Sequence, residues 1–172
     1  MESTIYPEAS LVRSDLAGAV SARQACAEPS TPARPARIMI VDDITLNVKV
    51  AKAHLSAAGY SDFVSLTDPS QAIPTIERDH PDILLLDLMM PEVSGLDILE
   101  QISSTATYGK LPVLVLTGSD SRELRQQALK LGAFDFLTKP VDPEELVVRV
   151  GNALKLKNHQ DELEREVQKR TA

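Results

Sequence analysis

The sequence predicts an α/β fold built on a doubly wound, five-stranded parallel sheet. Five short apolar runs each precede a stretch with helical periodicity, and regular alternation of strand and helix is typical of parallel sheets covered by helices. Hydrophobic residues make up 43% of the chain, but aromatic residues only 3%, with no Trp. The core is therefore expected to be aliphatic, as in buried parallel strands.

The predicted elements follow one another along the chain from Arg37. Five apolar runs of strand length are expected as strands, at 38–41, 63–66, 83–87, 112–117 and 134–138. Helices are expected after them, ending at Gly59 and then spanning 69–78, 95–103, 121–131 and the chain from 143 onward.

Glycine and proline support these helix boundaries. Gly59 and Gly132 stand where helices end, and the pairs Asp68-Pro69 and Asp142-Pro143 stand where helices begin. Pro74 departs from the pattern because it falls inside the second helix. There it would remove a hydrogen bond, unless the helix begins late or kinks.

Residues 1–36 are predicted to be a disordered N-terminal tail and linker. Pro29, Pro32 and Pro35 block helix and sheet at its end. A docking helix over 11–20 is the alternative, although so short a helix is marginal in water. The single cysteine, Cys26, has no partner with which to form a disulfide within the chain, which fits a reducing compartment.

Composition argues against several classes of partner. The net charge of −7 and a pI near 5.0 disfavour direct binding of nucleic acid, which needs clustered Lys and Arg. The apolar runs are far shorter than the ~20 residues of a membrane helix, and the N-terminus does not resemble a secretory signal. The sequence therefore predicts a cytoplasmic protein with no membrane partner.

Polar residues end four of the predicted strands: Asp42 and Asp43 the first, Asp87 the third, Thr117 the fourth and Lys139 the fifth. Ligands of open parallel sheets bind at the carboxyl ends of the strands, so these side chains are expected to meet. Taken singly, each Asp could be a helix cap, the Thr a turn hydroxyl and the Lys a surface charge. Their joint occurrence favours a functional site.

Three neighbouring carboxylates repel one another and need a cation. Oxygen ligands without His or Cys favour Mg²⁺, which readily shares a phosphate oxygen. A carboxylate beside a metal, a lysine and a hydroxyl is equipped to attack phosphorus and to form an aspartyl phosphate. Phosphoryl transfer requires mainly such positioning and electrostatics.

Over residues 37–154 the sequence resembles the receiver domain of bacterial two-component response regulators. The motifs that carry the resemblance are IMIVDD at 38–43, LLLDLMMP at 84–91 followed by Gly95, VLVLT at 113–117 and FDFLTKP at 134–140. The resemblance implies a flavodoxin-like sheet with strand order 2-1-3-4-5. It also implies a signalling switch, not an enzyme, and a cis bond between Lys139 and Pro140.

The resemblance assigns a role to each pocket residue. Asp87 is expected to accept a phosphoryl group from a sensor histidine kinase or a phosphotransfer protein. Asp42, Asp43, Asp87 and the backbone carbonyl of Met89 are expected to bind Mg²⁺. Lys139 is expected to pair with the phosphoryl group, and Thr117 to move towards it.

Three further positions match family sites. Phe136 matches the switch aromatic that reshapes the face of the fourth helix, fifth strand and fifth helix; the alternative is an ordinary core Phe. Met89 and Ser119 match positions flanking the path of attacking water, and an apolar Met89 is expected to slow hydrolysis. Alternatively, only the backbone of Met89 matters.

Residues 155–172 are predicted to extend the last helix beyond what a receiver domain needs. Every third or fourth position forms a heptad series with polar interruptions: Leu146, Arg149, Ala153, Leu156, Gln160, Leu163, Val167 and Arg170. The extension is either a solvated tail or a dimerising signalling helix that leads to an output domain or partner. The chain is then a fragment of a larger regulator or a stand-alone receiver.

Two other classes fit less well. A haloacid-dehalogenase-like phosphatase also uses an Asp at a strand end, but that family has a second Asp two residues later, where this chain has Met89. A nucleotide-binding fold would need a glycine-rich phosphate loop, and none occurs in the sequence. A receiver that binds partners without phosphorylation is disfavoured because all five expected site residues are present.

Overall fold

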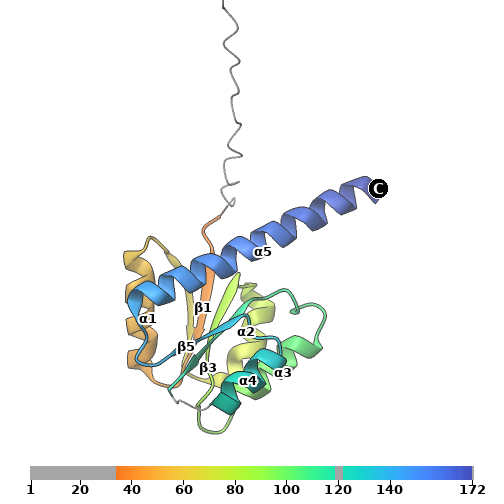
Figure 1. Cartoon of the computed structure of the whole chain (residues 1–172). Coiled ribbons are helices and arrows are strands. Elements are labelled where there is room, and N and C mark those ends of the chain that lie inside the picture. The colour runs from red at the N-terminus through yellow and green to blue at the C-terminus, as the bar shows by residue number, and fades with distance from the viewer. Residues whose placement is uncertain (1–33, 119–121, 172) are drawn as a thin grey trace, which may run out of the picture. The chain divides into compact units, whose positions relative to one another are not determined.

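The computed structural model describes residues 34–118 and 122–171 and contains a five-stranded parallel sheet (Figure 1). The strands are β1 (Arg37–Val41), β2 (Asp62–Leu66), β3 (Ile83–Asp87), β4 (Val113–Thr117) and β5 (Asp135–Thr138). Their order, β2-β1-β3-β4-β5, confirms the predicted fold. Observed strand bounds differ from the predicted ones by at most one residue.

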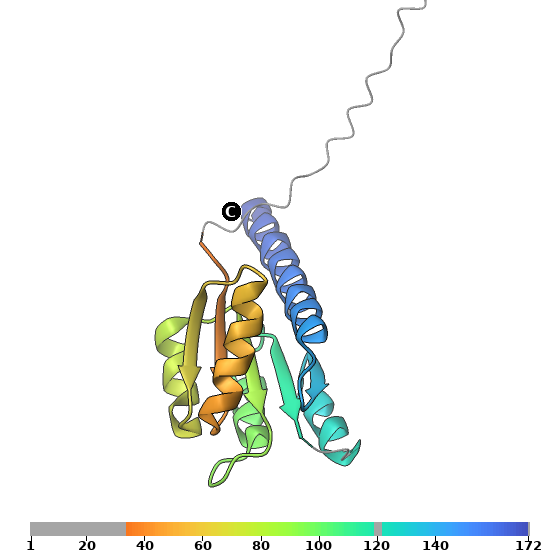
Figure 2. The same ribbon diagram turned by 90° about the vertical axis from the view of Figure 1, so that its left-hand side faces the viewer.

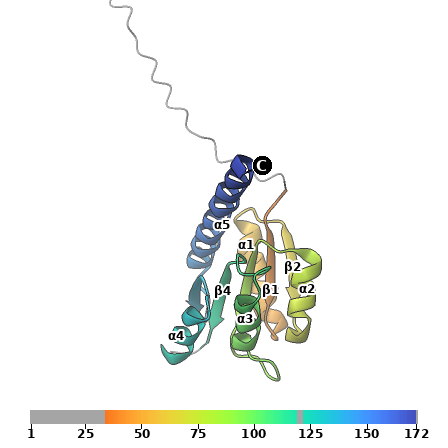
Figure 3. The same cartoon turned by 90° about the vertical axis from the view of Figure 1, so that its right-hand side faces the viewer.

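Helices cover both faces of the sheet. On one face α1 (Thr45–Ala57) and α5 (Pro143–Thr171) lie next to one another, as Figure 2 shows. On the other face α3 (Gly95–Ser104) lies between α2 (Ala72–Asp79) and α4 (Arg122–Lys130), as Figure 3 shows. This arrangement buries both faces of the sheet.

Side-chain alternation along the strands explains why the apolar runs are continuous. In β1, Ile38 and Ile40 belong to the core beneath α1 and α5, whereas Met39 and Val41 belong to the core beneath α2, α3 and α4. All residues of the central strands β3 and β4 are buried. A strand buried on both faces needs apolar side chains on both sides.

The second helix begins late, which removes the difficulty posed by Pro74. A short 3₁₀ helix, η1 (Pro69–Gln71), comes first and is capped by Asp68, which accepts a hydrogen bond from the Ser70 amide at 3.0 Å. Because α2 begins at Ala72, Pro74 lies in its first turn, where amides have no partner within the helix.

The predicted helix ends and the predicted cis bond are confirmed. Gly59 and Gly132 follow α1 and α4 with φ of +100° and +97°, values that suit glycine because it lacks a Cβ. The Lys139-Pro140 peptide bond is cis. Asp142 accepts a hydrogen bond from the Glu145 amide at 2.8 Å, as expected for the residue before α5.

The last helix continues well beyond the core. Its buried residues are Leu146, Val150, Ala153 and Leu154, so two members of the predicted heptad series pack inside the domain. Leu156, Leu163 and Val167 are 47%, 53% and 62% exposed. In the described ranges, no helix has the length and apolar character that crossing a membrane requires.

Candidate functional site

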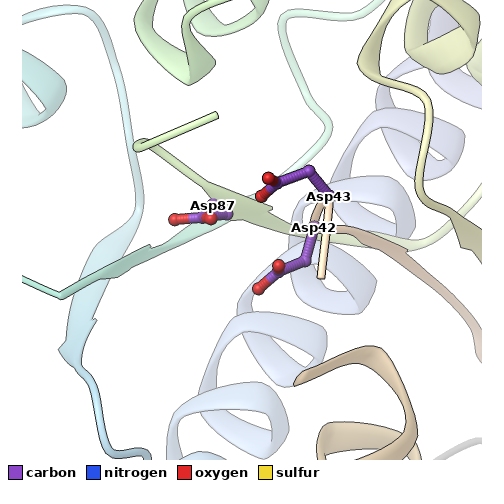
Figure 4. A group of neighbouring side chains, drawn as sticks. All are labelled: Asp42, Asp43 and Asp87. Carbon is purple, nitrogen blue, oxygen red and sulfur yellow. The ribbon is translucent and has the colours of Figure 1, made fainter. Parts of the chain in front are cut away.

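The carboxyl ends of the strands bring the predicted site residues together. Asp42 and Asp43 follow β1 and Asp87 ends β3; their side chains gather in one place (Figure 4). One carboxylate oxygen from each residue lies within 4.8 Å of the other two. Thr117 ends β4, and Lys139 follows β5 at the same rim.

Asp42 is completely buried and is held by the turn that leads into α1. Its Oδ1 accepts hydrogen bonds from the Ile44 amide at 2.9 Å and from Asn47 Nδ2 at 3.2 Å. Its Oδ2 lies 2.8 Å from Lys139 Nζ. The N-cap of α1 is Ile44 and no side chain caps the helix, so the reading of Asp42 or Asp43 as a helix cap is wrong. The sequence analysis did not identify Asn47.

Asp87 is 2% exposed and is oriented by its own loop. Its Oδ1 accepts a hydrogen bond from the Met89 amide at 3.1 Å, and its Oδ2 lies 3.1 Å from Lys139 Nζ. The loop packs closely on the start of α3, where a Cβ at Gly95 would lie 2.2 Å from the Asp87 backbone oxygen. Glycine is therefore required at that position.

Asp43 has a buried Oδ1 atom with no hydrogen-bond partner among the described residues. A buried carboxylate oxygen left in this state is costly. The Asp43 carboxylate also lies beside the carboxylates of Asp42 and Asp87. A cation bound among the three would therefore satisfy the unpaired oxygen and reduce the repulsion between the carboxylates. Oxygen donors of this kind suit a hard divalent cation.

Lys139 supplies the positive charge of the rim. Its backbone amide donates a hydrogen bond to the Thr117 carbonyl at 2.7 Å, which places its side chain beside β4 and the acidic cluster. Burial alone would lower the pKa of its ammonium group, but the contacts with Asp42 and Asp87 raise it overall. Lys139 is therefore a fixed cation.

Burial raises the pKa of the Asp87 carboxyl above its ordinary value. The Met89 amide and Lys139 act in the opposite direction, and the charge of Asp42 adds to the increase. The environment thus disfavours the charged form of Asp87 when only protein groups surround it. A bound cation would reverse that preference.

The remaining predicted residues differ in their burial. Thr117 is fully buried. Phe136 of β5 is partly buried, and the Arg125 guanidinium of α4 lies 5.1 Å from its ring centroid, a contact that the sequence analysis did not identify. Met89 exposes 59% of its surface. Ser119 lies outside the described residues.

Large apolar side chains are exposed on the segment that follows the acidic pair. Ile44, Leu46 and Val50 are 52%, 66% and 42% exposed. Since α1 begins immediately after the pocket, these side chains provide apolar surface at the N-cap of α1 and along its first two turns.

A doubly wound sheet with three carboxylates and a lysine at its carboxyl rim defines the class of protein: an α/β domain with an acidic pocket. The family model described as the response regulator receiver domain matches residues 38–151. The chain belongs to this receiver-domain family of two-component response regulators.

Curated relatives agree with this assignment. The chain is 41% identical over 128 residues to the response regulator PleD of Caulobacter vibrioides, a match that covers 74% of the chain and 28% of PleD. It is 40% identical over 129 residues to the response regulator MprA of Mycobacterium avium, covering 74% of the chain and 55% of MprA. The chain thus spans only part of the length of these relatives.

Solved structures show the same fold. A CheY-like receiver domain protein from Methanospirillum hungatei has a TM-score of 0.68 and 25% identity, covering 74% of this chain and 99% of that one. The receiver domain of the Francisella response regulator 1452 has a TM-score of 0.64 and 29% identity, covering 71% and 98%.

Proposed function

We propose that this receiver domain accepts a phosphoryl group on Asp87 in the presence of Mg²⁺ and uses the modification to control a partner or an output domain. The observation that carries the proposal is the position of the Lys139 ammonium. It contacts both Asp42 and Asp87, beside an Asp43 oxygen that has no partner among the described groups. This arrangement suits a site that handles added negative charge.

The donor set fits Mg²⁺. Asp42, Asp43 and Asp87 would supply carboxylate oxygens, and Met89 would supply its backbone carbonyl. The unpartnered Oδ1 atom of Asp43 supports this assignment because a buried carboxylate oxygen needs a proton donor or a cation. When bound, the ion would neutralise charge on the oxygens of the transferring group.

In the proposed reaction a carboxylate oxygen of Asp87 forms a bond to phosphorus, and the bond between phosphorus and the donor breaks. The donor leaves with the bonding electron pair, and Asp87 becomes a mixed anhydride with phosphate. Lys139 lies 3.1 Å from Asp87 Oδ2 and would offset the charge of the new group. Thr117, at the adjacent strand end, would donate its hydroxyl hydrogen to a phosphoryl oxygen.

The proposed switch begins when Thr117 moves towards the phosphoryl group to form this hydrogen bond. Thr117 ends β4, whose residue Val115 lies beside Phe136 of β5 in the sheet register. A changed position of Thr117 would alter the packing of Phe136 and therefore the surface made by α4, β5 and α5. The Arg125 contact with the Phe136 ring supports this route because it connects the ring directly to α4.

The proposed phosphoryl source is a sensor histidine kinase or a phosphotransfer protein. The exposed apolar residues Ile44, Leu46 and Val50 support docking next to the pocket. Because the chain spans only part of PleD and MprA, we propose that its target is an output domain or a separate partner. The exposed Leu156, Leu163 and Val167 support a homodimer formed through α5. Location in the cytoplasm stays a prediction from the sequence.

Intact-mass measurement after incubation with Mg²⁺ and a small phosphodonor tests the central proposal. We expect the native chain to gain the mass of one phosphoryl group, and Asp87→Asn to gain none. Asp97→Asn is the matched control, because Asp97 is an exposed carboxylate in the first turn of α3. Absence of a mass gain in the native chain, or an equal gain in Asp87→Asn, would contradict the proposal.

A further inference from the structure

The second half of α5 contacts the rest of the domain through charged side chains. The apolar packing of α5 ends at Leu154, and none of the described residues after it is buried. Lys157 Nζ lies 3.4 Å from Asp82 Oδ1. Glu164 forms an ion pair with Lys110. These two contacts are ionic, so they differ in kind from the packing of the first half of the helix.

Asp82 is a well-fixed anchor. Its Oδ2 accepts a hydrogen bond from the Arg37 amide at 2.7 Å. The Arg34 guanidinium donates to both carboxylate oxygens, at 2.9 and 3.2 Å. Burial would raise the pKa of Asp82, but the Arg37 amide and the charges of Arg34 and Lys157 lower it overall. Asp82 is therefore a stable negative charge.

Asp82 and Lys110, the two residues that α5 contacts, lie at the end of the sheet opposite the acidic pocket. Asp82 immediately precedes β3, and Lys110 lies in the loop that leads to β4. Figure 1 shows the second half of α5 extending past the end at which β1 begins. Asp82 also contacts Arg34, which precedes β1. The Asp82 carboxylate therefore connects the segment before β1 to α5.

The spacing of the contacts matches the helix. Lys157 lies two turns after Val150, which is buried, and Glu164 lies two turns after Lys157, so all three share one face. Leu156 and Leu163 precede these charged residues by one position and stay exposed. Since the helix presents a cation to Asp82 and an anion to Lys110, rotation or sliding of α5 would separate the pairs or bring like charges together.

We propose that Asp82 and Lys110 are positioning residues that hold the extension of α5 in one direction and in one rotation. In this arrangement the apolar residues Leu156, Leu163 and Val167 stay exposed and are available to a partner. Exposed ion pairs contribute little individually. The extension is therefore held weakly enough to be released. The inference does not depend on phosphoryl acceptance by Asp87.

Distance measurements between two spin labels test the inference. Labels are attached to Lys49→Cys on α1 and Gln168→Cys on α5 in a Cys26→Ser background; both label positions are exposed. We expect one narrow distance distribution in the otherwise native chain. In the Lys110→Gln/Lys157→Gln variant we expect a distribution about twice as wide. Raising the salt concentration from about 0.1 M to about 1 M, which shortens the screening length from roughly 10 Å to roughly 3 Å, should also broaden it.

Charge exchange separates positioning from general destabilisation. Lys110→Glu alone should broaden the distribution, and Lys110→Glu combined with Glu164→Lys should restore it. Lys155→Gln is the matched control because Lys155 is exposed and makes no ion pair within the described residues; it should have no effect. An unchanged distribution in the Lys110→Gln/Lys157→Gln variant, a broad one in the native chain, or no restoration by the exchange would overturn the inference.

Discussion

Lys139 Nζ lies 3.1 Å from Asp87 Oδ2, so the side chain proposed to receive a phosphoryl group is already paired with a cation. The same ammonium lies 2.8 Å from Asp42. One lysine therefore serves two buried carboxylates, and Asp43 adds a third carboxylate within 4.8 Å. The pocket therefore holds more negative charge than its own cation balances.

Asp87→Asn should stabilise the metal-free protein at neutral pH. The pKa of Asp87 is raised in the folded state, so the folded protein binds this proton more tightly than the unfolded chain. Stability therefore falls as pH rises from the unfolded pKa, about 3.9, through the folded pKa. The amide avoids that cost, and we expect a gain on the order of 1 kcal/mol, or roughly 4 °C in Tm.

Thermal unfolding in EDTA at about pH 7 and about pH 4 measures this effect. The difference between the native chain and Asp87→Asn should shrink at the lower pH, because the stability lost by ionising Asp87 in the folded state is recovered as pH falls towards the unfolded pKa. Asp97→Asn, an exposed carboxylate, should show no comparable gain. A less stable Asp87→Asn at neutral pH would mean that the ion pair with Lys139 outweighs the cost of burial.

Mg²⁺ should stabilise the native chain, and most of that effect should disappear in Asp43→Asn. A ligand at one hundred times its Kd contributes about 2.7 kcal/mol. Asp43 is the most informative carboxylate to replace, because its buried Oδ1 accepts no hydrogen bond from the described protein groups. Thermal unfolding across a Mg²⁺ titration gives the shift, with Asp97→Asn as the control. An equal shift in Asp43→Asn would place the ion elsewhere.

Met89→Asn should shorten the lifetime of the phosphorylated form. Met89 follows Asp87 by two residues and is 59% exposed, so its replacement leaves the core intact and keeps the backbone carbonyl. A polar amide can orient an attacking water, and we expect faster hydrolysis by a factor on the order of ten. Decay of the phosphorylated mass over time gives the rate. Met89→Leu should match the native chain, whereas an unchanged or slower rate in Met89→Asn would refute the idea.

Much of the site could be predicted from sequence because the fold itself gathers it. Asp42, Asp87 and Thr117 each stand directly at the end of an apolar run, and parallel connectivity brings such ends to one rim. The order of the strands followed only from the resemblance, because both faces of each central strand are buried and apolar character does not distinguish one neighbour from another.

Contacts between charged residues distant in sequence could not be predicted in the same way. Asp82 and Lys157 are individually ordinary surface residue types, and nothing in their local sequence pairs them; the path of α5 across the domain does. The contact of Arg125 with Phe136 likewise depends on how α4 packs beside β5. α2 begins late because the short 3₁₀ helix η1 precedes it. The apolar periodicity of residues 69–78 does not distinguish such a turn from the start of an α-helix.

Gly95→Ala should damage the pocket although Gly95 binds nothing there. A Cβ at this position would lie 2.2 Å from the Asp87 backbone oxygen and 2.7 Å from Leu88 Cα. Both are backbone atoms, so the loop that carries Asp87 and Met89 must move. We expect a loss of about 1–3 kcal/mol in unfolding free energy, as for other overpacked sites, measured by denaturant titration.

Gly118→Ala is the matched comparison for this substitution. Gly118 directly follows Thr117, yet a Cβ there would meet nothing within 4 Å, so the change in stability should stay within about 0.5 kcal/mol. Phosphorylation followed by intact mass should be slowed in Gly95→Ala, because the displaced loop also carries the Met89 amide that orients Asp87 Oδ1. If both variants lose stability equally, the close approach of α3 to the Asp87 loop does not determine the geometry of the pocket.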